Sequence, residues 1–188
     1  MVKQYLRFPF DEEKASQVAA ILVSKRGGSL KYLHLMKMLY TIDRTALAKW
    51  GQPVSGGRYC SMTKGPVISE ILDLIKGKAG KTRGHFWPQH LQTKGFDISL
   101  KKSAGSDRLS KAELDIIDTV FVMLGNRDRW DVVQWTHDEF KEWKDPGTTS
   151  APIAVEEILK AVGKTAGEIN EIATEAAYYG KIDTFLAR

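Results

Sequence analysis

The sequence predicts a mainly α, α-rich α+β fold: a compact bundle of about six helices with a small β-hairpin or short antiparallel sheet. Three observations predict this class. Apolar residues recur at helical spacing through most of the chain. Helix-start patterns of the form Ser/Thr-x-x-Glu occur three times, beginning at residues 110, 136 and 165. Alternation with a period of two residues, typical of a strand, is clear only at Phe96, Ile98 and Leu100.

The first half of the chain divides into helices at recognisable start and stop signals. Asp11 is an N-cap for a first helix, which the pair Gly27-Gly28 ends. We expect Ser29 to cap a mostly apolar central helix that stops at Gly51. Residues 54–63 then form a short strand or an extended loop. Pro66 fits the first position of the next helix, where a missing N–H costs nothing.

The second half begins with a glycine- and lysine-rich loop over residues 77–95, which contains one edge of a hairpin. The three helix-start patterns follow, with their two polar residues three positions apart so that each side chain reaches a free backbone N–H. They are Ser110 with Glu113, Thr136 with Glu139, and Thr165 with Glu168. A further helix is predicted within residues 152–162.

Composition indicates one globular domain over residues 1–188. The chain is 43% hydrophobic and 27% charged, which are ordinary globular values. The single cysteine, Cys60, excludes an internal disulfide and a multi-cysteine zinc site. No apolar run reaches the roughly 18 residues of a membrane span, and the first ten residues lack the apolar core of a signal peptide. We therefore expect a cytoplasmic protein.

The net charge of +5 is unevenly distributed along the chain. Residues 1–100 carry 16 Lys/Arg against 7 Asp/Glu, and residues 101–188 carry 12 against 16. A basic half suits an acidic partner or a phosphate backbone, although a solvated surface explains it equally well.

Two Gly-Lys-Thr tripeptides, residues 80–82 and 163–165, do not form a nucleotide-binding loop. That loop needs a glycine five residues before the second glycine, and the corresponding residues are Ile75 and Ile158. Each tripeptide also follows a predicted helix rather than a strand. Gly163 is better explained as the end of a helix.

The histidines and Cys60 give no established catalytic or metal-binding spacing. His85 and His90 would bind a metal only with a carboxylate from elsewhere, and we expect no metal or cofactor. His34 is expected to be a hydrogen-bonded core residue. Cys60 as a nucleophile would need a histidine brought beside it by the fold, so an inert buried thiol is the favoured interpretation.

Two surface features bear on partners. The loop with Lys76, Lys78, Lys81, Arg83, His85, Phe86 and Trp87 combines charge with aromatic rings, as phosphate-binding surfaces do. No nucleic-acid-binding signature accompanies it, so nucleic acid is an unlikely partner. The five tryptophans exceed the number that a core this size usually holds, and we expect one or two to face a partner.

An ordered set of short motifs over residues 15–145 resembles the Panacea antitoxin domain, also called SocA-like and described as phage-associated. The first part is the Lys-leucine-rich-Tyr segment from Lys37 to Arg44. A Gly-x-Pro-hydrophobic turn follows at residues 51–54, and an aromatic residue precedes Gly-Pro-Val at residues 65–67. Further along, Leu109-Ser110 with Glu113, and Thr136-His137 with Trp143, also resemble the family pattern. The segment after Pro146 resembles it less.

The resemblance implies an antitoxin that neutralises a cognate protein toxin by direct contact, with no catalytic activity and no cofactor. One branch of the family is linked to delivery of a toxin to a protease, so a protease-adaptor role is a further expectation. We expect exposed residues around the Gly-Pro turn to face the toxin. The expected partner-binding residues are Arg44, Arg58, Tyr59, Lys64, Gly65 and Pro66.

Two other function classes remain open from the sequence. A hydrolase using His137 with Asp138 or Cys60 would bring His137 and Cys60 together in an open pocket. A DNA-binding regulator would present a continuous basic face with a helix that fits a groove.

Overall fold

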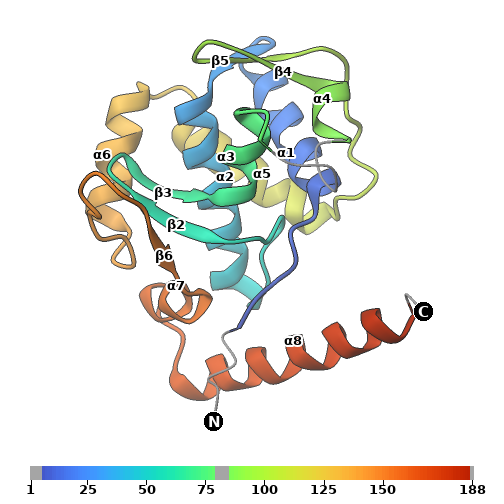
Figure 1. The fold of residues 1–188 in the computed structure, drawn as a ribbon, viewed down its shortest axis with the longest axis vertical. Helices are drawn as coiled ribbons and strands as arrows, with labels where there is room; N and C mark the ends of the chain where they lie inside the picture. Colours follow the sequence, from blue (N-terminus) through green and yellow to red (C-terminus); the bar gives the residue numbers. More distant parts are fainter. Residues whose placement is uncertain (1–5, 79–84, 187–188) are drawn as a thin grey trace.

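The computed structural model describes residues 6–78 and 85–186, and within them the chain is mainly helical (Figure 1). The described part contains eight helices rather than the six expected. They are α1 (Glu12–Lys25), α2 (Tyr32–Trp50), α3 (Ser69–Ile75), α4 (Trp87–His90), α5 (Lys111–Leu124), α6 (Arg129–Glu139), α7 (Val155–Ala161) and α8 (Ala166–Leu186). None of the described helices combines the length and apolarity needed to cross a membrane.

The β structure consists of two small antiparallel sheets, where the sequence predicted one hairpin or sheet. One sheet has the strand order β1-β5-β4, and the other β3-β2-β6. Their strands are β1 (Ser29–Lys31), β2 (Tyr59–Met62), β3 (Gly65–Ile68), β4 (Leu91–Lys94), β5 (Asp97–Leu100) and β6 (Ala151–Ile153). The predicted strand is β5: Ile98 is fully buried and Leu100 is half-buried, but Phe96 lies before the strand and is exposed.

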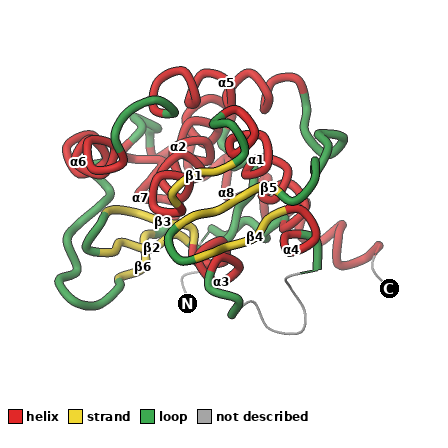
Figure 2. The backbone as a smooth tube through the Cα atoms, turned by 90° about the horizontal axis from the view of Figure 1, so that it is seen from above, coloured by secondary structure: helices red, strands yellow, loops and turns green. Residues whose placement is uncertain are grey.

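Helix α2 is the centre of the fold, because it contacts α1, α5, α6 and strand β3. Figure 2 shows α5 on one side of α2 and most of the strands on the other. Twelve of its 19 residues are buried, which explains its nearly continuous apolar sequence. It ends at Gly51, whose φ of 77° is the left-handed conformation of a helix C-cap.

Helix α8 packs through its first half and then projects beyond the body (Figure 1). Ile169 is buried, and Ile172 lies against Gly51, where an added Cβ would come within 2.7 Å of its side chain. Tyr178 and Tyr179 are exposed. Gly51 therefore serves both the end of α2 and the docking of α8.

Two of the three predicted helix starts are confirmed. Ser110 and Glu113 form the reciprocal capping box that begins α5, and Thr165 and Glu168 make the same contacts before α8. Thr136 with Glu139 is wrong. Helix α6 already begins at Arg129, capped by Asp128, and the Thr136 hydroxyl donates within the helix to the Val133 carbonyl. Three-residue spacing alone cannot separate a helix start from a helix interior.

Two other expected helix starts lie in strands. Ser29 belongs to β1, and α2 begins at Tyr32 instead. Pro66 belongs to β3, opposite Ser61 of β2, and α3 starts three residues later. In this sheet β3 is an edge strand, paired with β2 on one side. On the other side the missing N–H of Pro66 therefore costs no hydrogen bond between strands. The predicted strand or extended loop at residues 54–63 contains β2.

Candidate functional site

The candidate site lies where α2 meets the β2–β3 hairpin, and α2 supplies it with two buried charges. Lys37 is completely buried, and its Nζ donates to the Pro66 carbonyl at 2.8 Å. Burial lowers the pKa of the Lys37 ammonium group to about 7. Gly65, with a φ of 92°, brings the hairpin close to this group. A Cβ there would lie 2.9 Å from Lys37 Nζ and 2.8 Å from Thr136 Oγ1.

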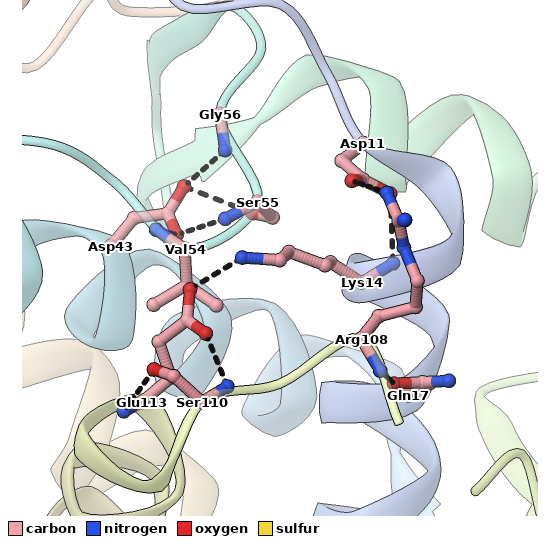
Figure 3. A network of polar contacts seen from close by, with 10 residues as sticks. All are labelled: Asp11, Lys14, Gln17, Asp43, Val54, Ser55, Gly56, Arg108, Ser110 and Glu113. Atoms are coloured by element: carbon pink, nitrogen blue, oxygen red, sulfur yellow. Dashed lines mark hydrogen bonds and ion pairs between the residues drawn. The ribbon is translucent and has the colours of Figure 1, made fainter. Parts of the chain in front are cut away.

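Asp43 is the second buried charge, and it holds the segment before β2 in place. Its carboxylate accepts hydrogen bonds from the backbone N–H groups of Val54, Ser55 and Gly56 and from the Ser55 hydroxyl (Figure 3). The Tyr59 hydroxyl adds a fifth bond at 2.9 Å. Burial raises the pKa of Asp43 to about 6, while these hydrogen bonds act in the opposite direction.

Polar contacts continue from this loop to the starts of α1 and α5 (Figure 3). The Asp11 N–H donates to the Ser55 carbonyl, and the Asp11 carboxylate caps α1. Lys14 forms an ion pair at 2.6 Å with Glu113, the residue that closes the capping box of α5. Three segments distant in sequence are therefore fixed relative to one another.

Arg44 is held inward by a third buried charge, the carboxylate of Glu142. Its Nε lies 2.8 Å from Glu142 Oε1, which also accepts a hydrogen bond from the Tyr40 hydroxyl. The Glu142 side chain is fully buried and that of Arg44 is 19% exposed. The guanidinium also lies over the Phe140 ring, 4.4 Å from its centroid. Little of the Arg44 side chain is therefore accessible to a binding partner.

Arg58 and Lys64, the exposed members of the expected partner-binding set, flank strand β2. Arg58 forms an ion pair at 2.9 Å with the buried Glu70, yet its own side chain is 62% exposed. Burial alone would raise the pKa of Glu70, but hydrogen bonds from Arg58 bring it below its usual value. Lys64 lies in the turn after β2, with its Nζ 5.0 Å from the centre of the Trp130 ring.

The structure therefore does not assemble the six expected partner-binding residues into one exposed surface. Tyr59, Gly65 and Pro66 are buried, so the expectation that Tyr59 is exposed is wrong. The Tyr59 side chain faces Asp43 because alternate residues of β2 point into the core. Arg58 and Lys64 lie at opposite ends of β2, about 15–20 Å apart at the rise of a strand.

His137 and Cys60 lie in different surroundings. The His137 ring stacks on Trp143 with centroids 3.8 Å apart, and the Trp143 Nε1 donates to the Met62 carbonyl. These contacts tie the last turn of α6 and the segment after it to strand β2. Cys60 is half-buried, and burial raises the pKa of its thiol. No hydrogen bond joins Cys60 to His137 in the described part of the chain.

The other histidines take structural positions. His34 is buried, with its Nε2 3.0 Å from the Leu124 carbonyl, which confirms the expected core histidine. His90 Nδ1 lies 2.8 Å from the Ser103 carbonyl, and its ring stacks on Phe86. Among the described residues no group of three or more His, Cys, Asp or Glu is placed to hold a metal ion.

The basic aromatic loop is only partly described, since Lys81 and Arg83, like the tripeptide 80–82, lie outside the described residues. Trp87 is buried and Phe86 is half-buried, so these two rings pack inward instead of offering a stacking surface. Gly163 follows the end of α7 with a φ of 91°, as the helix-end interpretation requires. Two of the five tryptophans, Trp50 and Trp130, are largely exposed.

Residues 35–144 match the family model described as antitoxin SocA-like, Panacea domain. The chain belongs to this SocA-like antitoxin family. The match covers α2 to α6 and the β2–β3 hairpin, and therefore includes Lys37, Asp43 and Glu142. No curated protein and no solved structure matches the chain significantly.

Sequence reasoning missed the surface beside Trp130. The stretch from Asn126 to Trp130 holds two arginines and a tryptophan, and all of its side chains are exposed or half-exposed. The signal was present in the sequence as Arg-x-Arg-Trp. A helix start predicted at Thr136 leaves this stretch outside the helix, whereas α6 begins at Arg129.

Proposed function

We propose that this SocA-like chain is an antitoxin that neutralises a cognate protein toxin by direct protein–protein contact, without catalysis and in the cytoplasm. The match to the antitoxin family over residues 35–144 is the observation that carries the proposal. The family indicates a protein partner.

The distribution of polar groups supports a binding function. Lys37, Asp43 and Glu142 are buried and bound to backbone or side-chain partners within the fold. Such internal networks fix the positions of the hairpin and of the loop before it. A partner would then meet a preorganised surface, and binding would lose less free energy to ordering.

The position of Cys60 supports binding rather than hydrolysis. A nucleophilic cysteine needs a lowered pKa, and burial raises that of Cys60. Its thiol neighbours include Ser69 and Arg58, whereas His137 is stacked on Trp143. Both observations argue against Cys60 as the nucleophile of a hydrolase.

Co-expression with the open reading frame adjacent to the gene tests the proposal. We expect that the neighbouring protein arrests growth when expressed alone, that this chain restores growth, and that the two proteins co-purify. A harmless neighbour, or restored growth without a complex, would contradict direct neutralisation.

The half-life of the toxin separates two forms of neutralisation. If the chain only covers the toxin, the toxin persists in a stable complex. If the chain is an adaptor that delivers the toxin to a protease, the toxin disappears faster when the chain is present. A pulse-chase measurement with and without the chain distinguishes these outcomes.

Charge removal beside β2 gives a prediction for the two exposed residues of the expected partner-binding set. We expect Arg58→Gln combined with Lys64→Glu to slow association with the toxin by about tenfold, because exposed charges act mainly on encounter rates. Glutamine is chosen at Arg58 because a glutamate would face the buried Glu70. Stopped-flow association kinetics measure the effect.

Lys111→Gln with Lys160→Glu is the matched control: it makes the same change of net charge, both lysines are exposed, and neither forms an ion pair with a described residue. An association rate equal to that of this control would place Arg58 and Lys64 outside the toxin-binding surface.

A further inference from the structure

A polar hollow of about 410 Å³ lies between the end of α1, strand β1 and the connection from α5 to α6. Its walls carry four cationic side chains, Arg26, Lys31, Arg127 and Arg129, and two carboxylates, Asp97 and Asp128. None of the six expected partner-binding residues lines it.

The carboxylates of the hollow already have partners. Asp97 Oδ2 accepts a hydrogen bond from Lys31 Nζ at 2.7 Å, and Asp128 Oδ1 accepts one from the N–H of Trp130 as the cap of α6. Arg26 donates to the neutral Asn126 side chain at 3.2 Å. Arg127 and Arg129 form no ion pair with any described residue. Within the described part of the chain, three guanidinium groups therefore line the hollow without forming an ion pair.

Trp130 extends this charged surface toward the β2–β3 turn. It is 48% exposed. The guanidinium of Arg129 lies 5.3 Å from the ring centroid, and the Nζ of Lys64 lies 5.0 Å from it. Arg26, Arg127, Arg129, Trp130 and Lys64 thus form a continuous surface, which we call the basic band. Tryptophan and arginine are the residues most enriched at the energetic centres of protein interfaces.

We propose that the basic band is the toxin-binding surface, and that the toxin presents an acidic segment to it. Carboxylates of the toxin occupy the hollow beside the three arginines, and an apolar side chain packs on Trp130. Planar guanidinium groups suit carboxylates because they donate two parallel hydrogen bonds. This inference rests on the proposed antitoxin function and names the surface that performs it.

The observations favour an acidic protein over a nucleic acid. Asp97 and Asp128 line the hollow, and Asp131 is exposed in the first turn of α6, so acids are interspersed along the band. They would oppose a continuous row of phosphates, whereas a protein can place its carboxylates between them.

Reversal of two charges in the band tests the proposal. Arg127→Glu with Arg129→Glu is compatible with folding, because Arg127 is exposed and a glutamate at the start of α6 suits the positive end of a helix. Affinity for the toxin identified by co-expression is measured by titration calorimetry. We expect at least about a 30-fold loss for the double variant and about a tenfold loss for Trp130→Ala, the range of interface hot spots.

The control variant Lys111→Glu with Lys160→Glu carries the same change of net charge and should bind within about threefold of the wild type. If the double reversal and Trp130→Ala both bind like this control, the band is not the toxin-binding surface. If the double reversal fails to fold, as judged by circular dichroism, the affinity of Trp130→Ala alone is compared with that of the control. Equal affinities would then show that the band is not the toxin-binding surface.

Two further outcomes distinguish a failure of the antitoxin function from a failure of the basic band alone. A wild-type chain that forms no complex with the toxin overturns the antitoxin function together with the band. A wild-type complex that persists unchanged in both the double variant and Trp130→Ala overturns the band alone. A 20-nucleotide single-stranded oligothymidylate is the second probe. The proposal is wrong if the wild type binds this oligonucleotide, the double variant does not bind it, and the double variant keeps its affinity for the toxin. In that case the band binds nucleic acid.

Discussion

Replacement of Asp43 with alanine is expected to lower the free energy of unfolding by about 3–5 kcal/mol, the cost typical of removing one member of a buried charged network. The substitution leaves five donors without their acceptor: the N–H groups of residues 54–56 and the hydroxyls of Ser55 and Tyr59. Each unsatisfied buried donor costs about 1–3 kcal/mol, and partial access of water reduces the sum.

Urea denaturation followed by circular dichroism measures this loss. The control is Asp138→Ala, which removes an exposed carboxylate whose one hydrogen bond among the described residues comes from Gln134 of α6, and it should change stability by less than about 0.5 kcal/mol. Asp43→Asn preserves the shape but turns an amide toward donors, so we expect an intermediate value. A loss below about 1 kcal/mol for Asp43→Ala would contradict this prediction and show that water hydrogen-bonds to the five freed donors.

The second large effect concerns Lys37 and pH. Burial lowers the pKa of the Lys37 ammonium group from its ordinary value of 10.5 to about 7 in the folded chain. Between these two values the unfolded chain binds more protons than the folded chain, so stability rises with pH over this window. Below about pH 7 the lysine is charged in both states, and its contribution no longer changes. The slope is about 1.4 kcal/mol per pH unit.

Comparison of the wild type with Lys37→Met isolates this contribution. We expect the difference in unfolding free energy between the two proteins to shift by about 3 kcal/mol in favour of the wild type between pH 7 and pH 9.5. Asp43 is ionised throughout this range, and the titration of Cys60 is common to both proteins. Urea denaturation at four pH values gives the curve. Parallel curves for the two proteins would contradict a neutral buried lysine.

Local sequence patterns predicted those features of the fold that depend on neighbouring residues. The capping boxes at Ser110 and Thr165 are confirmed, as are the end of α2 at Gly51 and the core position of His34. Each depends on contacts within a few residues or on a long apolar run. The family was likewise predicted from ordered motifs and is confirmed by the match over residues 35–144.

The failures share a physical cause, which is competition between a local signal and a distant partner. Pro66 carries the signal of a helix start, but pairing with β2 places it in a strand. The Thr136 spacing is correct, yet the cap that begins the helix is Asp128, eight residues before Thr136. Asp128 precedes Asp131 by three residues, a weaker version of the same start signal.

The sequence by itself determined the mainly helical fold, two of its helix caps and the family. Only the tertiary structure decided which charges are internal and which face outward. Lys37 reaches Pro66 across 29 residues, and Arg44 reaches Glu142 across 98. The basic band likewise joins Arg26, Lys64 and Arg129 from three separate segments. Whether a charge is solvated or buried depends on which distant groups surround it, and the order of residues along the chain does not show which groups those are.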